Sequence, residues 1–368
     1  MRILLVSSFV LPHAGGVEQF VATVRRTLED AGCEVRVLAC RRPGQDTSAD
    51  ALVPTRFLGA SGWPVPVGGW QVLWREVGRA DAVIANAAIH VLPALAVLAA
   101  RRRGVPALFV VHGSGRPLPT GSAAFRAARH WFRRTLARTA LRRSLPVSVS
   151  RIGVEGVWEQ FGVRAEHLPY PLPALPRALP VPAPGADEPL RVVWIGRLSP
   201  EKDPESAVAA VERVRDERPA VLDVFGDGRL RPRLDALATA RPWLTVHGSR
   251  PWPEILEAQE RAHVLLSTSV WDNAQVALLE ALARGVPAVS TAVGDAPRYL
   301  LEPSLERFCV APGDPDTLAR ALAELGGSYD RFRGGFAVNG ERLRAIHGDA
   351  GHVLRELVAL AGARRDGR

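Results

Sequence analysis

The stretch RVVWIGRLSPEKDP, residues 191–204, decides the fold of this chain. Residues 191–195 predict a buried strand, a glycine turn follows, and the closing proline suits the first position of a helix over residues 203–217. The same succession recurs along the chain, with further strands predicted at 3–7, 34–39, 81–86, 107–112, 221–225, 244–247, 264–267, 288–291 and 308–311. Apolar strands that alternate with helices are typical of parallel sheets covered on both faces, so the sequence predicts a doubly wound α/β protein.

A proline-rich segment divides this pattern into two. Residues 170–189 contain seven prolines, a composition that packs neither as a helix nor as a sheet. We therefore predict one domain over residues 1–172, a linker over 173–189 and a second domain over 190–345. The remaining residues, 346–368, predict a C-terminal helix or tail that can cross back to the first domain. Ligands of such sheets bind beyond the carboxyl ends of the strands, often where two domains meet.

The composition is that of a globular protein of a reducing compartment. The 368 residues are 47% hydrophobic and 23% charged, and the three cysteines have the spacing of neither a zinc site nor a redox pair. The apolar run at the N-terminus is short and leads into a glycine-rich turn, which favours a first strand over a signal peptide. No run reaches the ~20 apolar residues that a membrane-spanning helix needs, so we expect a cytoplasmic protein.

The turn at residues 196–203 combines the features of an anion site. Gly196 lets a ligand approach the backbone, Arg197 offers a planar fork for phosphate oxygens, and Lys202 offers a compact charge. The amides at the start of the following helix add to the same site. Of the 47 basic residues only Lys202 is a lysine, which indicates a position that arginine does not fill equally well. A solvated turn with surface charges is the alternative.

Two further segments follow predicted strands and suit a nucleotide ligand. Gly226 and Gly228, in FGDGR, permit the close approach of a phosphate, although a tight turn before a helix explains them equally well. Asp272, in WDNAQVALLEA, lies at a strand exit, where it accepts hydrogen bonds from hydroxyl groups or caps the next helix. Glu280 lies two turns into that helix among apolar residues, so its carboxylate must be paired with an arginine or bound to a ligand.

Together these motifs resemble the retaining glycosyltransferases of family 4, which have the GT-B fold. The resemblance rests on GRLSPEK (residues 196–202), on the spacing of Asp272 and Glu280 with seven residues between them, and on ARGVP (residues 283–287). The N-terminal segment PHAGGVE (residues 12–18) is similar to the first glycine-rich loop of that family.

The resemblance extends over nearly the whole chain, because His112 matches the family's histidine after a first-domain strand and residues 147–150 match its strand before the linker. It implies two Rossmann-like domains that face each other across a cleft, with residues 1–172 on the acceptor side and 190–345 binding the nucleotide sugar. It implies a retaining transferase that needs neither a metal ion nor another cofactor. The donor would be a UDP- or GDP-sugar supplying a hexose or N-acetylhexosamine. The acceptor is unidentified, with lipid-linked molecules and natural products as candidates.

The resemblance also implies roles for individual residues. Arg197 and Lys202 would bind the donor diphosphate and stabilise its charge as it leaves. Asp272 would contact the hydroxyl groups of the donor sugar, Glu280 would contact the ribose, and His112 would lie close to the transferred sugar. We expect four of these residues to be catalytic: His112, Arg197, Lys202 and Asp272. The remaining donor-binding positions are Gly15, Gly16, Gly196, Gly226, Gly228, Asn273, Ala274, Gln275 and Val276.

Three departures from the family pattern concern mainly the sugar end of this site. Asp272 stands where a glutamate is usual, and residues 273–275 read NAQ where the family has Gly-Phe-Gly. Residues 170–172 read YPL where an Asn-Gly pair usually precedes the second domain. The diphosphate turn is unchanged, so these departures put the identity of the donor sugar in question more than the activity.

Positive charge is concentrated in one part of the chain. Residues 82–154 contain twelve arginines and no acidic residue, so the rest of the chain sums to −3 within a net charge of +9. Residues 124–143 predict a basic helix, which either lies on anionic lipid or packs on a core with its arginines in solvent. Its apolar face comprises Phe125, Ala128, Phe132 and Leu136. We expect peripheral contact with the inner face of a membrane through Arg126, Arg129, Arg133 and Arg134.

Other functions fit less well or stay open. A dehydrogenase needs Gly-x-Gly-x-x-Gly after its first strand, and residues 13–18 fail that spacing. A phosphorylase needs a lysine for its cofactor, whereas Lys202 already has a place in the diphosphate turn. Nucleic-acid binding lacks a recognition motif. A nucleotide-sugar epimerase on the same fold and a non-catalytic nucleotide-sugar binding protein are the two alternatives.

Overall fold

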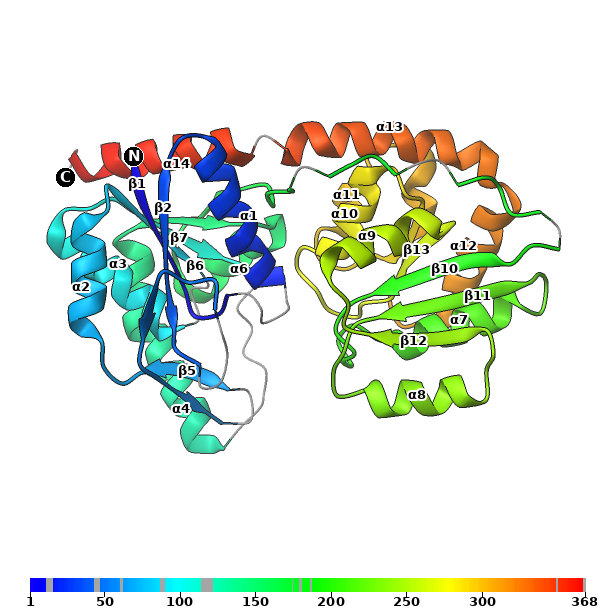
Figure 1. Ribbon diagram of the computed structural model, residues 1–368, viewed down its shortest axis with the longest axis horizontal. Helices are drawn as coiled ribbons and strands as arrows, with labels where there is room; N and C mark the ends of the chain where they lie inside the picture. Colours follow the sequence, from blue (N-terminus) through cyan, green and yellow to red (C-terminus); the bar gives the residue numbers. More distant parts are fainter. Residues whose placement is uncertain are drawn as a thin grey trace. The chain divides into compact units, whose positions relative to one another are not determined.

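The computed structural model describes residues 1–10, 16–42, 47–59, 62–86, 90–113, 122–173, 175–178, 181–185, 187–348 and 350–366. Two compact units make up the chain: Met1–Pro173 with His347–Arg368 form the first, and Ala174–Ile346 form the second. Each unit is built on a parallel sheet with helices on both faces (Figure 1). None of the helices in this described part of the chain is both long enough and apolar enough to cross a membrane.

The first unit contains a sheet of seven parallel strands. These are β1 (Arg2–Ser7), β2 (Glu34–Cys40), β3 (Ala51–Val53), β6 (Ala82–Asn86), β7 (Ala107–Val111), β8 (Leu145–Ser148) and β9 (Glu166–His167). Their order in the sheet is β3-β2-β1-β6-β7-β8-β9. A separate antiparallel hairpin joins β4 (Thr55–Leu58) and β5 (Trp63–Pro66). The helices are α1 (Gly16–Asp30), α2 (Trp70–Arg79), α3 (Val91–Arg103), α4 (Ala123–Phe132), the π-helix η1 (Arg133–Ala137), α5 (Arg138–Arg142), α6 (Arg151–Phe161) and α14 (Ala350–Asp366).

The second unit contains a sheet of six parallel strands. These are β10 (Leu190–Ile195), β11 (Ala220–Phe225), β12 (Leu244–Gly248), β13 (Val264–Ser267), β14 (Ala288–Thr291) and β15 (Cys309–Val310). Their order is β12-β11-β10-β13-β14-β15. The helices are α7 (Pro204–Val214), α8 (Arg231–Thr239), α9 (Trp252–Arg261), α10 (Val276–Arg284), α11 (Ala296–Tyr299), the 3-10 helix η2 (Pro303–Phe308), α12 (Pro315–Gly327) and α13 (Tyr329–His347).

The topology marks where ligands of each sheet are expected. Every residue of β6 and β7 is buried, as continuous apolar runs predict for strands covered on both faces. Strand β1 lies between β2 and β6, and β10 lies between β11 and β13, so the order of crossovers reverses at these two strands. Doubly wound sheets bind ligands beyond the carboxyl ends of the strands at such a reversal. The segments after β10 and β13 are therefore the expected place for a site in the second unit.

The described residues of the proline-rich segment after Pro173 belong to the second unit and are hydrogen-bonded to it. Arg284 donates from Nε to the carbonyl of Pro176 (3.1 Å), and its own carbonyl accepts from the amide of Ala178 (3.1 Å). Arg333 donates to the carbonyl of Val181 (3.3 Å). Extended proline-rich backbone has no internal hydrogen bonds, so its carbonyls are open to such donors.

The last residues of the chain return to the first unit. The amide of Leu172 donates to the carbonyl of His347 (3.3 Å), and Nδ1 of His347 lies 2.9 Å from the carbonyl oxygen of Tyr170. Helix α14, drawn in red in Figure 1, then packs against α1, β7 and β8. The C-terminal helix therefore covers part of the first sheet.

The basic helix predicted over residues 124–143 is interrupted. It runs as α4, the π-helix η1 and α5 in succession. The hydroxyl groups of Thr135 and Thr139 each donate to a carbonyl four residues earlier, at 2.7 Å. Such bonds compete with the backbone ladder and widen a helix locally. Of the predicted apolar face, Phe132 is buried and Ala128 is exposed, and within the π-helix Ala137 is buried whereas Leu136 is only half-buried.

Candidate functional site

The turn after β10 packs closely against the turn after β11. The amide of Gly196 donates to the carbonyl of Phe225 (3.0 Å). Gly226 and Gly228 have φ of 133° and 154°, and an added Cβ would lie 1.8 Å from the carbonyl oxygen of Gly196 and 2.4 Å from that of Leu198. Both glycines are therefore required by the contact between the two turns. Their contact with a donor phosphate stays a prediction.

Lys202 is held in place by a chain of buried hydrogen bonds. The indole Nε1 of Trp194, on β10, donates to Oγ1 of Thr268 (3.0 Å), just after β13. That oxygen lies 3.1 Å from the carbonyl of Lys202 and 2.6 Å from the carbonyl of Asp203. Asp203 has a φ of 47°, and its carboxylate caps α7 through the amide of Ser206 (3.3 Å). The lysine thus stands on a loop that the neighbouring strand fixes.

Lys202 and Asp272, which the family resemblance assigns to the same donor, are brought together by the two loops that follow β10 and β13. Nζ of Lys202 forms an ion pair with Oδ2 of Asp272, whose Oδ1 accepts from the amide of Asn273 (2.8 Å). The two loops are also joined through the backbone, because the carbonyl of Glu201 accepts from the amide of Trp271 (3.2 Å). Arg197 is exposed and makes no ion pair with the described residues.

Gln275, just before α10, has a buried side chain. Its side chain points into the protein, where Oε1 accepts from Ser267 Oγ (2.6 Å) and Nε2 donates to the carbonyl of Val293 (2.8 Å). The residue is 4% exposed and has a φ of 38°. Its side-chain amide is therefore committed to the protein, and the expected contact of the backbone amides of residues 273–276 with a donor stays a prediction. The carbonyl of Ala274 is likewise occupied, by the hydroxyl of Tyr299 (2.7 Å).

The backbone at the start of α10 still offers donors to an anion. The first hydrogen bond of this helix runs from the amide of Leu279 to the carbonyl of Gln275 (3.0 Å). The amides of residues 276–278 therefore have no partner within the helix, as at every helix N-terminus. With the helix dipole they favour an anion near Val276.

Glu280 is a buried carboxylate that its neighbouring arginine does not neutralise. It is 6% exposed, and burial raises its pKa to about 7. The guanidinium of Arg284, one turn later, is committed elsewhere: it donates to the carbonyl of Leu256 (2.8 Å) and to Gln259 Oε1 (3.0 Å) and pairs with Glu260. Arg284 is therefore not the ion-pair partner of Glu280.

Trp252 is a residue that no motif pointed to. It begins α9, and its Nε1 is buried without a hydrogen-bond partner among the described residues. Its indole lies near Glu280 and acts to lower the pKa of that carboxyl, without a hydrogen bond of normal geometry. The only sequence signal was a tryptophan at a helix start after a strand, next to Pro251.

In the first unit, His112 is held as a neutral ring. Its Nε2 lies 2.5 Å from Oδ1 of Asn86, whose Nδ2 donates to Ser7 Oγ (3.2 Å). Because the Asn86 oxygen only accepts, Nε2 carries the proton and Nδ1 keeps its lone pair. The ring stands edge-on to Phe20 at 4.6 Å. Burial lowers the pKa of His112 to about 3, so the ring stays neutral in ordinary buffers.

Gly16 lies at the start of α1 in the same unit, and its carbonyl accepts from the hydroxyl of Tyr170 (2.8 Å). Tyr170, one of the residues that depart from the family pattern, therefore ties the end of this unit to the first helix. Gly15 lies outside the described residues. His112 and Gly16 thus belong to the first unit, and the other described residues of the expected site belong to the second.

The arginines expected to face a membrane fall into two pairs. Arg126 and Arg134 are exposed. Arg129 and Arg133 are half-buried, with their guanidinium carbons 5.8 Å and 5.4 Å from the ring centres of Phe125 and Phe161. The second pair packs on the protein itself, so the exposed face of this helix includes Arg126, Arg134 and Trp131, which is 67% exposed.

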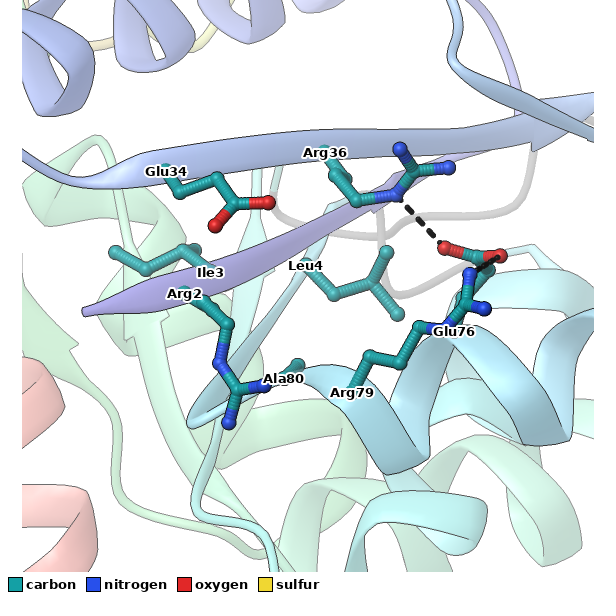
Figure 2. A pocket seen from close by; sticks show the side chains of 8 residues that line it. All are labelled: Arg2, Ile3, Leu4, Glu34, Arg36, Glu76, Arg79 and Ala80. Carbon is teal, nitrogen blue, oxygen red and sulfur yellow. Dashed lines mark hydrogen bonds and ion pairs between the residues drawn. The ribbon is translucent and has the colours of Figure 1, made fainter.

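A pocket of about 370 Å³ lies at the amino ends of β1 and β2 (Figure 2). Its arginines are paired: Arg36 lies 2.8 Å from Glu76, Arg79 lies 3.6 Å from the same carboxylate, and Arg2 lies 2.7 Å from Asp81. The pocket is at the opposite end of the strands from where such sheets bind ligands. It is therefore not the candidate site. Its lining consists of Arg2, Ile3, Leu4, Glu34, Arg36, Glu76, Arg79 and Ala80.

Two family models match this chain. A model described as Glycosyltransferase Family 4 matches residues 14–169, and a model described as Glycosyl transferases group 1 matches residues 189–327. The two matches follow the two units closely, with the boundary between them in the proline-rich segment.

Curated proteins show weaker similarity. A phosphatidylinositol N-acetylglucosaminyltransferase subunit from Arabidopsis thaliana is 24% identical over 340 residues, which cover 88% of this chain and 73% of that protein. An exopolysaccharide phosphotransferase of Streptomyces coelicolor is 30% identical over 148 residues, which cover 39% of this chain and 15% of that protein. The chain therefore spans only a small part of this second relative.

Solved structures share the fold over the whole chain. HepE of Anabaena, crystallised with UDP and glucose, has a TM-score of 0.73 and 16% identity, and the match covers 98% of this chain and 99% of that one. The sucrose-phosphate synthase of Thermosynechococcus elongatus has a TM-score of 0.73 and 18% identity over 99% of both chains. At this level of identity the likeness shows the fold.

Proposed function

The chain belongs to the family 4 glycosyltransferases and has the GT-B fold, and on this premise we propose that it transfers a sugar from a nucleotide-sugar donor with retention of configuration. The donor is a UDP- or GDP-sugar that carries a hexose or an N-acetylhexosamine. HepE was crystallised with UDP, which supports a UDP-sugar, and the Arabidopsis relative is named for N-acetylglucosamine transfer, which supports an N-acetylhexosamine.

The observation that carries the proposal is the ion pair of Lys202 and Asp272. Lys202 follows β10 and Asp272 follows β13, which are neighbours at the strand where the crossovers reverse. A cation for phosphate and a carboxylate for sugar hydroxyl groups therefore stand together at the ligand end of the sheet. The open amides at the start of α10 follow directly.

Charge on the departing diphosphate is what such a protein has to stabilise. Transfer breaks the bond between the anomeric carbon and the phosphate oxygen and leaves negative charge on the diphosphate. Arg197, Lys202 and the amides of residues 276–278 are fixed donors for that charge. The attacking hydroxyl group approaches from the face that the diphosphate leaves, and the leaving phosphate oxygen accepts its proton. Configuration is then retained, and no protein base is needed.

His112 contributes to this proposal as a neutral group. Its Nε2 is occupied by Asn86, so Nδ1 offers a lone pair to a hydroxyl group of the transferred sugar. A neutral ring adds no positive charge beside the sugar, which itself becomes positive during transfer.

We also propose that the reaction needs no metal ion. Arg197, Lys202 and the helix amides supply the positive charge that a divalent cation supplies in other transferases. Turnover in the presence of a chelator should therefore equal turnover without it.

Peripheral membrane contact belongs to the same proposal. Trp131, Arg126 and Arg134 are exposed on α4 and η1, and such a combination of tryptophan and arginine suits the boundary of an anionic membrane. The Arabidopsis relative is named for a phosphatidylinositol acceptor, which supports a lipid-linked acceptor here.

The test is a screen of UDP-, GDP-, ADP- and dTDP-sugars by melting temperature and by release of nucleoside diphosphate. A bound donor raises the melting temperature by mass action. Transfer to an added acceptor supports the proposal. Interconversion of two donor sugars without an acceptor supports an epimerase instead, and stabilisation without any product supports a binding protein.

A further inference from the structure

His90 carries a buried polar atom in the first unit that has no partner. It stands just before α3, and its Nδ1 is buried without a hydrogen-bond partner among the described residues. Its ring stands edge-on to that of Phe9, with 5.4 Å between the ring centres. His90 follows β6 and Phe9 follows β1, and these strands are paired where the crossovers reverse. The unsatisfied nitrogen therefore lies at the ligand end of the first sheet.

Arg129 and Arg133 bring positive charge to the same region. They lie one turn apart on α4 and η1, both are half-buried, and neither forms an ion pair with a described residue. Residues 82–154, which include both arginines, contain no aspartate or glutamate. Helix α3 packs against η1, and burial together with the charge of Arg129 lowers the pKa of His90 to about 4. Arg129 therefore lies close to a neutral His90 ring.

The two arginines lack a counter-charge. Burial, and then the charge of Arg129, lower the pKa of Arg133, so each arginine makes the other less favourable. The rings of Phe125 and Phe161 contact them, yet such contacts contribute only ~0.5–1 kcal/mol at partly exposed sites and leave the net charge unchanged. Charges withdrawn from water are normally paired, so this pair is suited to a bound anion.

The chemistry of the cluster selects a phosphate group. A phosphate monoester carries about −1.5 to −2 charges at neutral pH, which matches two arginines, whereas a carboxylate carries one. A guanidinium presents a planar fork to phosphate oxygens. A neutral imidazole has one N–H, so Nδ1 of His90 can donate to a further oxygen of the same group.

His90 is also a neighbour of the residue expected beside the transferred sugar. Burial, and then the nearby His90, lower the pKa of His112. An acceptor must reach the transferred sugar, so a ligand that contacts His90 is close to where the acceptor is expected. Phe57 lies beside Phe9, with 6.2 Å between the ring centres, and adds apolar surface to this region.

We propose that Arg129, Arg133 and His90 bind a phosphate group carried by the acceptor. The inference rests on the proposed function, which supplies the acceptor, and it adds the chemical class of that acceptor. The phosphate belongs either to a lipid, whose chain would lie on Phe9 and Phe57, or to a water-soluble molecule. The site lies entirely within the first unit.

The test measures binding of decyl phosphate, decanoate and inorganic phosphate by titration calorimetry, below the concentration at which micelles form. All proteins carry Lys202→Ala, which removes the phosphate site expected in the second unit. Arg129→Gln with Arg133→Gln is compared with Arg126→Gln with Arg134→Gln, a control that loses the same charge from exposed positions of the same helix. His90→Phe keeps the ring and changes no charge, so it tests the site even if the first double variant fails to fold. Melting temperatures establish which variants are folded.

We expect loss of Arg129 and Arg133 to weaken binding of decyl phosphate at least about tenfold, and His90→Phe to weaken it about fivefold. The control should bind as the parent protein does, and decanoate should bind the parent more weakly than decyl phosphate. Tighter binding of decyl phosphate than of inorganic phosphate indicates a lipid phosphate, and equal binding indicates a soluble one.

The inference is overturned if both double variants bind decyl phosphate equally and His90→Phe binds it as the parent does, or if decanoate binds as tightly as decyl phosphate. Release of nucleoside diphosphate is measured separately on proteins that retain Lys202. If phosphate binding depends on Arg129 and Arg133 but no donor is turned over, the proposed function fails and the phosphate site stands.

Discussion

Lys202 and Asp272 form an ion pair across the two loops that follow β10 and β13. The pair is only partly buried, with 28% of the lysine side chain and 16% of the aspartate side chain exposed. The two loops are held to each other, because Thr268 after β13 donates to the backbone of the lysine loop and the carbonyl of Glu201 accepts from Trp271, while the Asp272 carboxylate accepts from the amide of Asn273. A donor whose phosphate binds Lys202 and whose sugar binds Asp272 therefore needs no rearrangement of either side chain.

Gln275 tests how much the loop before α10 depends on its inward side chain. Gln275→Gly and Gln275→Ala both lose the hydrogen bonds to Ser267 and Val293. Only glycine relieves the positive φ of 38°. We expect both variants to raise the KM for the donor. The free energy of unfolding of the glycine variant should exceed that of the alanine variant by about 1 kcal/mol. Urea titrations and donor kinetics measure this, and equal stabilities would contradict the backbone argument.

His112 should affect stability in acid. Its pKa is about 3 in the folded protein, against an ordinary value of 6.5. Between pH 3 and pH 6.5 the ring is therefore protonated in the unfolded chain and neutral in the folded protein. Stability contributed by the neutral ring is present above pH 6.5 and is lost as the pH falls toward 3. His112→Gln should reduce the slope of unfolding free energy against pH by up to about 1.4 kcal/mol per pH unit between pH 6 and 4. His130→Gln, on the exposed side of α4, is the control, and an unchanged slope in the His112 variant would contradict the assignment.

Glu280 should show the opposite sign. Its pKa is about 7 in the folded protein against an ordinary value of 4.5, so the folded protein holds an extra proton between these values. Stability therefore falls as the pH rises from 4.5 to 7, and Glu280→Gln should remove this fall. Because ribose binds the carboxylate form, nucleotide affinity should rise between pH 6 and 8 more steeply in the wild type than in Glu280→Gln. Parallel pH dependences in calorimetry would contradict the ribose contact.

The exposed surface of α4 and η1 predicts binding to anionic lipid. Trp131→Ser combined with Arg126→Ser and Arg134→Ser should reduce flotation with vesicles that contain phosphatidylglycerol severalfold. The control carries the same loss of charge in the second unit, as Val338→Ser with Arg320→Ser and Arg331→Ser. Equal flotation of both triple variants would remove the membrane contact from the account.

Much of this architecture could be predicted because it depends on local patterns. Apolar runs between helices predicted the strands of both sheets, and adjacent strands of a doubly wound sheet necessarily bring their following loops together. The meeting of Lys202 and Asp272 follows from that rule.

The features that escaped prediction depend on contacts between distant segments. The inward turn of Gln275 needs the carbonyl of Val293 at the right distance, and nothing within residues 273–275 indicates it. The position of Trp252 depends on the hydrogen bond from Arg284 on α10 to Leu256, which fixes α9 relative to α10. Arg129 and Arg133 look like surface charges on a helical projection, yet aromatic rings cover them in the fold.

The most direct test of the central claim is the release of nucleoside diphosphate from the donor sugar that the screen identifies, compared between the wild type, Lys202→Ala and Asp272→Asn. Both side chains are partly exposed, so the two variants should stay within about 1 kcal/mol of wild-type stability. We predict that Lys202→Ala lowers kcat at least about a hundredfold, because a fixed cation on the leaving diphosphate is lost, and that Asp272→Asn lowers it less. Near-normal turnover by folded Lys202→Ala would contradict the account.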